Sequence, residues 1–489
     1  MACRTVCLLG VWASFFVSVC SCHALAGQPP RAEAPAPALR YTVTYQREPE
    51  HALDVEILLS GPQAPREFLF TQQGRVDEVR VLDARGAPGD TLSVSSEGEV
   101  VLPETARGLR YHYPLEVQGR RSWQDFTAGS GQGDSWHVAG RAWMLRPRVV
   151  EPGLRAELVF RGVDALPPWA PDAQGVYHLK GDDLVDSGFL GLGGRRCTVH
   201  PAGGEVEVAI LGRTSHVDDA ALCAWVLQAA NEVLTVRHSF PFPRVTVRLA
   251  VVPHSDDAGL FGMLLWSSPP SISVLVGQDA APEDFSHDWV LVHEMLHMTH
   301  PTFVPSVSWL TEGIATYYTE IARARSGRQT AEHAWRELLK GFNRGHEDVG
   351  SRTLEDVVTQ DDTYQGLYWS GALFALHLDV QLRRVTHGAR GLESVLDLLA
   401  TTHPVATLED FGAAVDQVAG QPLFQSLLAQ HWKRPAFAEQ APLLQALGVE
   451  SRPGGIKLGA APDSQLREAL EARRSGTVRG ATPSEGRSL

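Results

Sequence analysis

Between about residue 40 and residue 213, apolar and polar residues alternate in short runs that clusters of Gly, Pro and Asp separate. The runs are Val43/Tyr45, Leu53/Val55/Ile57/Leu59, Leu109/Tyr111/Tyr113, Ala156/Leu158/Phe160 and Val206/Val208/Ile210. Alternation with a period of two residues is typical of a strand that buries one face. Several short strands at this spacing favour a β-sandwich. We therefore predict an N-terminal β-sandwich domain over residues 40–213.

From residue 214 onward the apolar residues take the spacing of helices. Asp218 or Asp219 can cap a helix that runs to about Arg237, and strand-like runs follow at 245–251 and 272–276. Helical spacing then occurs at 286–300, 308–325, 330–343, 366–386, 408–418 and 421–432. The fold class predicted is α+β and multidomain, with a second domain at 214–400 and a C-terminal helical part at 401–473.

The two ends of the chain have the composition of segments outside the folded domains. Arg4 precedes an apolar run from Val6 to Val19, which is shorter than the roughly 20 residues that span a bilayer. Residues 1–26 therefore read as a cleaved export signal, which places the protein in the periplasm or outside the cell. Attachment of a lipid at Cys22 is the alternative that would tether it to a membrane. Residues 27–39 read as a Pro/Ala-rich linker, and 474–489 as a disordered tail.

The net charge of the chain bears on its partners, and its cysteines bear on a disulfide. The formal net charge of −14 repels phosphate backbones, which argues against nucleic acid as a partner. Only Cys197 and Cys223 lie outside the export signal. In an oxidising compartment they could form a disulfide that links the two domains, although two buried free thiols fit the sequence equally well.

The segment His293-Glu294-Met295-Leu296-His297 carries the strongest chemical signal in the chain. Residues four apart lie one above the other on a helix, so two imidazoles can reach one metal ion. The Glu between them can then reach a water molecule beside the ion and act as a general base. Apolar neighbours place the motif on a core helix, where two unpaired histidines would be costly to bury.

A third metal ligand follows in the next predicted helix. Glu312 stands fifteen positions after His297, a gap that fits a turn and an antiparallel helix that returns to the ion. Two His and one Glu, with the fourth position left to water, are the ligands of catalytic zinc. The alternative is that Glu312 is a solvated carboxylate near a helix start. His300 is a rival ligand, but Pro301 disfavours helical geometry there, so we interpret His300 as a cation at the helix end.

These residues resemble the glycyl aminopeptidase family of gluzincins, relatives of aminopeptidase N and thermolysin. The likeness covers about residues 40–450. It rests on His293-Glu294-x-x-His297, Trp309-x-x-Glu312-Gly313, the helix end at 323–327, Tyr368-x-x-Gly371-Ala372, Leu376-x-Leu378-Asp379 and Leu444-x-x-Leu447-Gly448. The resemblance implies an N-terminal β-domain and a thermolysin-like zincin catalytic domain with a helical C-terminal part.

The resemblance also implies roles for the site residues. His293, His297 and Glu312 would bind one zinc ion per chain, Glu294 would be the general base, and Tyr368 would stabilise the oxyanion. Tyr364 takes that last role if Tyr368 faces inward.

The sequence departs from the family in two places. The 40 residues after Val449 are too few for the PDZ domain of many relatives, and residues 262–266 contain no acid where aminopeptidases place a Glu for the substrate amine. We expect a zinc metallopeptidase that acts on peptides or proteins, with exopeptidase and endopeptidase activity both open. The competing hypothesis is an inert, zinc-stabilised binding protein of the cell envelope.

Overall fold

Three sheets build the N-terminal part of the computed structural model, which describes residues 37–472 except 62, 71–75, 116–129 and 361. Their orders are β13-β11-β1-β2-β7-β4-β5, β10-β3-β6 and β12-β14-β9-β8. The strands are β1 (Leu39–Gln46), β2 (Ala52–Leu59), β3 (Glu67–Leu69), β4 (Asp77–Leu82), β5 (Pro88–Thr91), β6 (Glu99–Val101), β7 (Gly108–Pro114), β8 (Ser130–Gln132), β9 (Ser135–Ala139), β10 (Arg146–Pro147), β11 (Arg155–Arg161), β12 (Ala165–Leu166), β13 (Tyr177–Lys180) and β14 (Phe189–Leu192). Two short helices, α2 (Gly140–Trp143) and α3 (Gly181–Val185), interrupt them.

The alternation seen in the sequence is the alternation of burial along these strands. In β1 every second residue is buried, and β1 pairs with β2 antiparallel and with β11 parallel. The buried tyrosines keep their hydroxyls satisfied: Tyr41 donates to the Leu145 carbonyl at 2.9 Å, and Tyr111 donates to the Trp143 carbonyl at 2.7 Å. The predicted N-terminal β-rich part is confirmed.

A fourth sheet has five strands in the order β15-β16-β17-β19-β18. Its strands are β15 (Arg195–Val199), β16 (Glu205–Leu211), β17 (Arg244–Val252), β18 (Phe261–Leu265) and β19 (Ser271–Gly277). The run Val206/Val208/Ile210 is therefore a strand as predicted, but it pairs with β17 rather than with the N-terminal sheets. The borders predicted at 213, 400 and 473 stay predictions.

Helices dominate the remainder of the chain. They are α4 (Asp219–Val233), α5 (Pro282–His287), α6 (Val290–Leu296), the 3₁₀ helix η1 (His297–Thr299), α7 (Ser308–Ser326), α8 (Ala331–Val349), α9 (Leu354–Gln360), α10 (Tyr364–Val385), α11 (Leu392–Thr402), α12 (Leu408–Ala419), α13 (Phe424–Trp432), α14 (Gln440–Ala446) and α15 (Ser464–Glu471). Short strands β20 (Thr302–Phe303), β21 (Val405–Ala406), β22 (Val449–Arg452) and β23 (Gly455–Leu458) lie between them.

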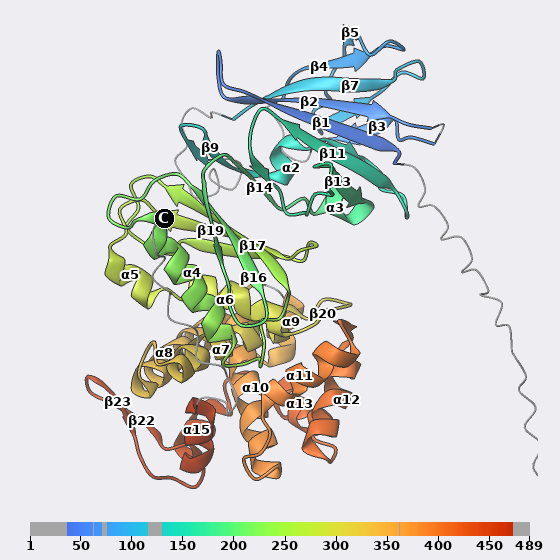
Figure 1. Ribbon diagram of the computed structural model, residues 1–489. Coiled ribbons are helices and arrows are strands. Elements are labelled where there is room, and N and C mark those ends of the chain that lie inside the picture. Colours follow the sequence, from blue (N-terminus) through green and yellow to red (C-terminus); the bar gives the residue numbers. More distant parts are fainter. Residues whose placement is uncertain (1–36, 62, 71–75, 116–129, 361, 473–489) are drawn as a thin grey trace, which may run out of the picture. The chain divides into compact units, whose positions relative to one another are not determined.

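One hydrophobic core joins this sheet to its helices. The odd-numbered residues of β17, from Val245 to Leu249, pack with residues of α4, α6, α7 and α10. Figure 1 shows α4 and α6 beside the strands of this sheet, and α6 contacts both β18 and β19. In the described part of the chain, no helix combines the length and the apolar character needed to cross a bilayer.

The expected capping signals act where the sequence placed them. Asp218 caps α4, because its carboxylate accepts a hydrogen bond from the Ala221 N–H at 2.8 Å. Gly327 ends α7 in the left-handed conformation, with φ of 82°, which glycine adopts without strain. The export signal, most of the linker, Cys22 and the tail lie outside the described residues.

Cys197 of β15 and Cys223 of α4 form a disulfide, with their Cα atoms 6.6 Å apart. The predicted proximity is confirmed. Cys197 lies in the five-stranded sheet and Cys223 in the helix that covers it, so the bond fastens α4 to the sheet.

We predict that Cys223→Ser lowers the free energy of unfolding by about 3 kcal/mol, because the bond closes a loop with a sequence separation of 26 residues. Urea denaturation followed by circular dichroism measures the change. The wild type and the variant should unfold together in a reducing buffer. Equal midpoints in an oxidising buffer would contradict the prediction.

Candidate metal centre and active site

The helix that carries the His-Glu-x-x-His motif is shorter than the sequence predicted. The segment 286–300 is divided into α5, α6 and η1, because the Asp288 carboxylate accepts hydrogen bonds from the N–H groups of Val290 and Leu291 and starts α6 there. Val290, Leu291 and Val292 are buried against the sheet as expected, whereas Trp289 is 49% exposed. The motif thus lies on a core helix, and the Asp288 carboxylate, which precedes that helix, fixes its first turn.

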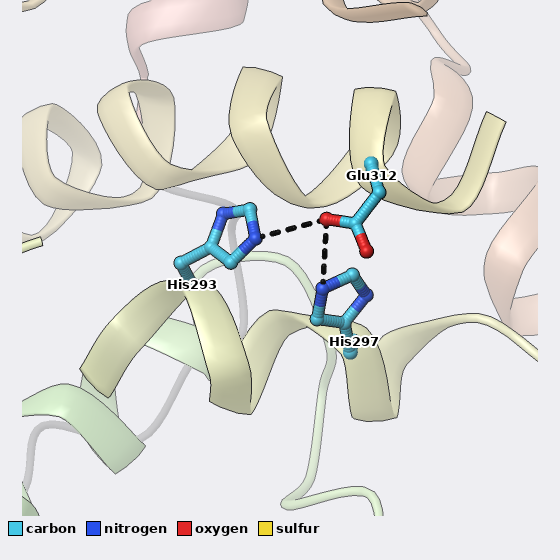
Figure 2. A group of neighbouring side chains, drawn as sticks. All are labelled: His293, His297 and Glu312. Atoms are coloured by element: carbon cyan, nitrogen blue, oxygen red, sulfur yellow. Dashed lines mark hydrogen bonds and ion pairs between the residues drawn. The ribbon is translucent and has the colours of Figure 1, made fainter. Parts of the chain in front are cut away.

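Three side chains from α6, η1 and α7 converge on one point, as Figure 2 shows. His293 Nε2 lies 3.2 Å from Glu312 Oε2, and His297 Nε2 lies 3.3 Å from the same oxygen. His293 lies in α6, His297 begins η1 one turn later, and Glu312 comes from the second turn of α7. The donor atoms all lie within 4.8 Å of one another.

These separations fit a metal ion better than direct ion pairs. Two ligands each about 2.0–2.2 Å from a tetrahedral zinc ion are roughly 3.3 Å apart, since they subtend the tetrahedral angle. Charge-assisted hydrogen bonds between nitrogen and carboxylate are shorter, at about 2.7–2.9 Å. The observed 3.2 and 3.3 Å match the spacing expected between two ligands of one zinc ion.

The charge state of the Glu312 side chain suits a cation site. Burial alone would raise the pKa of the Glu312 carboxyl, but its hydrogen bonds with His293 and His297 outweigh burial and hold the pKa well below its usual range. The carboxylate is therefore ionised at neutral pH and provides the negative charge that a divalent ion requires.

The Nδ1 atom of each imidazole, on the far side of the ring from the convergence point, contacts a polar group. His293 Nδ1 lies 3.4 Å from the Thr319 hydroxyl, which itself donates to the Ala315 carbonyl. His297 Nδ1 lies 3.1 Å from His300 Nε2. Contacts of this kind turn the Nε2 atoms toward the shared point next to Glu312.

The interpretation of His300 as a helix-end cation is wrong. His300 is only 5% exposed, and burial, followed by the neighbouring His297, lowers its pKa to about 3. It is neutral at physiological pH. It is also not a rival ligand, because it faces the Nδ1 atom of His297 and not the point where the Nε2 atoms meet.

Glu294 of α6 faces strand β18. Its Oε2 accepts a hydrogen bond from the Leu264 N–H at 2.8 Å. Burial, opposed in part by His297, raises the pKa of Glu294 to about 7. Gly262 permits this approach, because a Cβ atom there would lie 2.5 Å from the Glu294 Cγ.

Tyr368 reaches the site because α7 and α10 touch through glycines. A Cβ at Gly313 would lie 2.2 Å from the Gly371 backbone, and one at Gly371 would lie 1.9 Å from the Trp309 carbonyl. The ring of Tyr368 consequently stacks on His293, with centroids 6.0 Å apart. Burial and then the Glu312 charge raise the pKa of the Tyr368 hydroxyl, so it stays protonated and able to donate.

Two hollows flank the convergence point, and Tyr368 lines both. One, of about 330 Å³, is bounded by His293, Trp289 and the start of α10; the other, of about 480 Å³, runs along β18 past Glu294 and Glu312. Tyr364, the alternative oxyanion donor, is 64% exposed at the rim of the first hollow. A chain extended through both hollows would pass all the proposed site residues.

The sequence reasoning missed several contributors to this site. His300 and Thr319 were not recognised as partners of the two histidines, and the Leu264 N–H was not expected to hold Glu294. Gly313 and Gly371 were quoted only as parts of motifs. Glycines next to a predicted ligand and a predicted catalytic residue were the available signal of helices in backbone contact.

Comparisons with known proteins place the fold. No protein-family model and no curated protein matches the sequence. A crystal structure of an aminopeptidase N family protein from Idiomarina loihiensis aligns with 84% of this chain and 78% of its own, at 15% identity and a TM-score of 0.64. The chain shares its fold with that protein.

Two more structures align over most of the chain with lower scores. The M1 zinc metallopeptidase from Deinococcus radiodurans has 16% identity, covers 87% of this chain and 95% of its own, and has a TM-score of 0.46. Native yeast LTA4 hydrolase has 11% identity, coverages of 85% and 68%, and a TM-score of 0.47. The fold shared with the aminopeptidase N family protein confirms the predicted fold class, whereas the narrower likeness to glycyl aminopeptidases stays a prediction.

We predict that the purified protein holds about one zinc ion per chain and that removal of the ion with EDTA lowers its melting temperature. An ion that binds only the native state stabilises that state in proportion to its affinity. Glu312→Gln should lose most of the zinc and become insensitive to EDTA. Elemental analysis and calorimetry measure both effects.

Glu347→Gln is the matched control. Glu347 is exposed on α8, away from the site, and the substitution replaces a carboxylate by an amide as Glu312→Gln does. It should keep both the zinc and the response to EDTA. Full zinc content in Glu312→Gln would contradict the ligand assignment.

Proposed function

We propose that this protein is an exported, zinc-dependent metallopeptidase that hydrolyses peptide bonds, with Glu294 as general base. The observation that carries the proposal is the convergence of His293, His297 and Glu312 at the spacing of zinc ligands. The fold shared with an aminopeptidase N family protein supports it. Zinc, when bound, would polarise the substrate carbonyl and lower the pKa of a water molecule.

Glu294 is placed to move the proton in this reaction. The Leu264 N–H fixes one carboxylate oxygen, and the side chain lines the same hollow as His297 and Glu312. The pKa of about 7 that burial produces would fall beside a divalent cation, which stabilises the carboxylate. Glu294 would accept the proton of the attacking water and pass it to the leaving amine.

Tyr368 would stabilise the negative charge that develops on the substrate carbonyl oxygen. Its hydroxyl is protonated, and the residue lines both hollows beside Glu312. One donor to a developing oxyanion contributes a factor of about 10²–10³ to turnover. Tyr368→Phe should therefore slow turnover by that factor and leave zinc binding unchanged.

Strand β18 offers the peptide a place to bind. It is the edge of the five-stranded sheet, and Phe261, Gly262, Met263 and Leu264 line the larger hollow. An extended peptide can bind to such an edge through main-chain hydrogen bonds. The acidic net charge of −14 supports a peptide or protein substrate rather than nucleic acid.

The export signal at 1–26, and with it a periplasmic or extracellular location, is part of the proposal and rests on sequence alone. The Cys197–Cys223 disulfide supports an oxidising compartment. Membrane attachment applies only if Cys22 carries a lipid.

We predict that Glu294→Gln keeps its zinc and loses nearly all peptide hydrolysis, because the three ligands remain while the proton acceptor is gone. Cleavage of a broad peptide library, read by mass spectrometry, measures activity. Glu347→Gln, exposed on α8, should retain wild-type rates.

The inert binding protein is the competing function, and the same experiment decides it. A wild-type protein that binds zinc but cleaves no peptide, and that Glu294→Gln leaves unchanged in every property, would establish the binding protein instead.

We further predict that N-acetylated peptides are cleaved about as well as free ones. Among the described residues lining the two hollows, the carboxylates besides Glu294 and Glu312 are Glu320 and Glu337. Glu320 accepts from Gln329, and Glu337 pairs with Lys340 at 2.8 Å, so neither is poised for a substrate amine. Paired peptides with and without an acetyl group measure the preference.

A charged amine bound by a dedicated carboxylate would contribute about 1.5–3 kcal/mol, or roughly 10–100-fold in kcat/KM. A loss of that size on acetylation would show that a carboxylate does bind the amine, and the chain would be an aminopeptidase.

A further inference from the structure

A chain of two hydrogen bonds continues behind His297, away from the metal centre. His297 Nδ1 lies 3.1 Å from His300 Nε2, and His300 Nδ1 lies 2.9 Å from the Pro301 carbonyl oxygen. The His300 ring is 5% exposed and lies between Trp266 and Phe303, with centroids 6.2 Å from each. The ring therefore has little freedom to turn.

The direction of these hydrogen bonds follows from what each group can do. A carbonyl oxygen only accepts, so His300 Nδ1 must carry a proton and donate to Pro301. A neutral imidazole has one N–H, which leaves a lone pair on His300 Nε2. His297 Nδ1 must then donate to it, because two lone pairs or two N–H groups would repel each other.

The consequence reaches the metal centre. With its proton on Nδ1, His297 directs the lone pair of Nε2 toward the Glu312 carboxylate 3.3 Å away, an arrangement that requires a cation between the two atoms. This is the tautomer that can coordinate a metal ion. His293 is held less closely, because its Nδ1 lies 3.4 Å from the Thr319 hydroxyl.

We propose that His300 is a positioning residue that fixes the tautomer and the ring orientation of His297 for zinc binding. The inference rests on the proposed zinc site, and it assigns to His300 a role toward His297 rather than toward the substrate. Partners of this kind change metal affinity by about 10–100-fold when they are removed.

The test compares the zinc affinities of two variants by competition with a chelator at neutral pH. In His300→Phe a ring of similar size fills the space but accepts no hydrogen bond, so zinc should bind about 10–100-fold more weakly. In His300→Gln the amide oxygen can take the place of Nε2 as acceptor, so most of the affinity should return. Equal affinities of His300→Phe and wild type would overturn the inference.

A second buried histidine pair in this chain provides the matched control. His431 Nε2 lies 2.8 Å from His377 Nδ1, and His431 is 2% exposed. His431→Phe thus removes a buried His–His hydrogen bond far along the sequence from the motif, and it should leave zinc affinity unchanged. A loss as large as that of His300→Phe would show a general effect of stability and would overturn the positioning role.

A measurement on the wild-type protein tests the same inference if His300→Phe does not fold. Nitrogen-15 spectra of the zinc-loaded protein with labelled histidine should show His300 and His297 both protonated on Nδ1. A His300 ring protonated on Nε2 would overturn the inference. A wild-type protein without zinc affinity would instead overturn the proposed function, so the two failures are distinguishable.

Discussion

The convergence of two imidazoles and one carboxylate on a point between α6 and α7 is the constraint on which the rest of this structure depends. Nε2 atoms of His293 and His297 must both lie within about 3.3 Å of one oxygen of Glu312, which leaves little tolerance in how the helices pack. Contacts at several points position the helices that carry these side chains. Asp288 starts α6, Gly262 lets strand β18 approach it, and the glycines of α7 and α10 bring those helices into backbone contact.

Farther from the site, a buried ionic network holds α7, α10 and α11 together. Arg383 bonds to Glu393 at 2.6 Å and to Asp379 at 3.1 Å, and the Tyr318 hydroxyl donates to Glu393. Burial alone would raise the pKa of Glu393, but Arg325 and Arg383 outweigh burial and hold it below its usual range. Removing one partner would leave an uncompensated buried charge, which costs about 3–5 kcal/mol. The helices that carry Glu312 and Tyr368 are thus locked at their far ends.

The sequence predicted the features that follow from local periodicity and spacing. The strands β1, β2, β7 and β11, the helix α7 and the convergence of the motif with Glu312 all follow from patterns within short segments. What it missed depends on tertiary context. The polar His300 looks exposed beside a proline, and only the folded chain buries it. The run at 206–210 alternates like the runs before it, and only strand pairing assigns it to the five-stranded sheet.

The most direct test of the account is a crystal structure of the zinc-supplemented protein with anomalous diffraction recorded at the zinc edge. We expect one anomalous peak per chain, bound by His293 Nε2, His297 Nε2 and a Glu312 oxygen at about 2.0–2.2 Å, next to the Glu294 carboxylate. A map with no peak between these three residues, or with the ion held elsewhere in the chain, would contradict it.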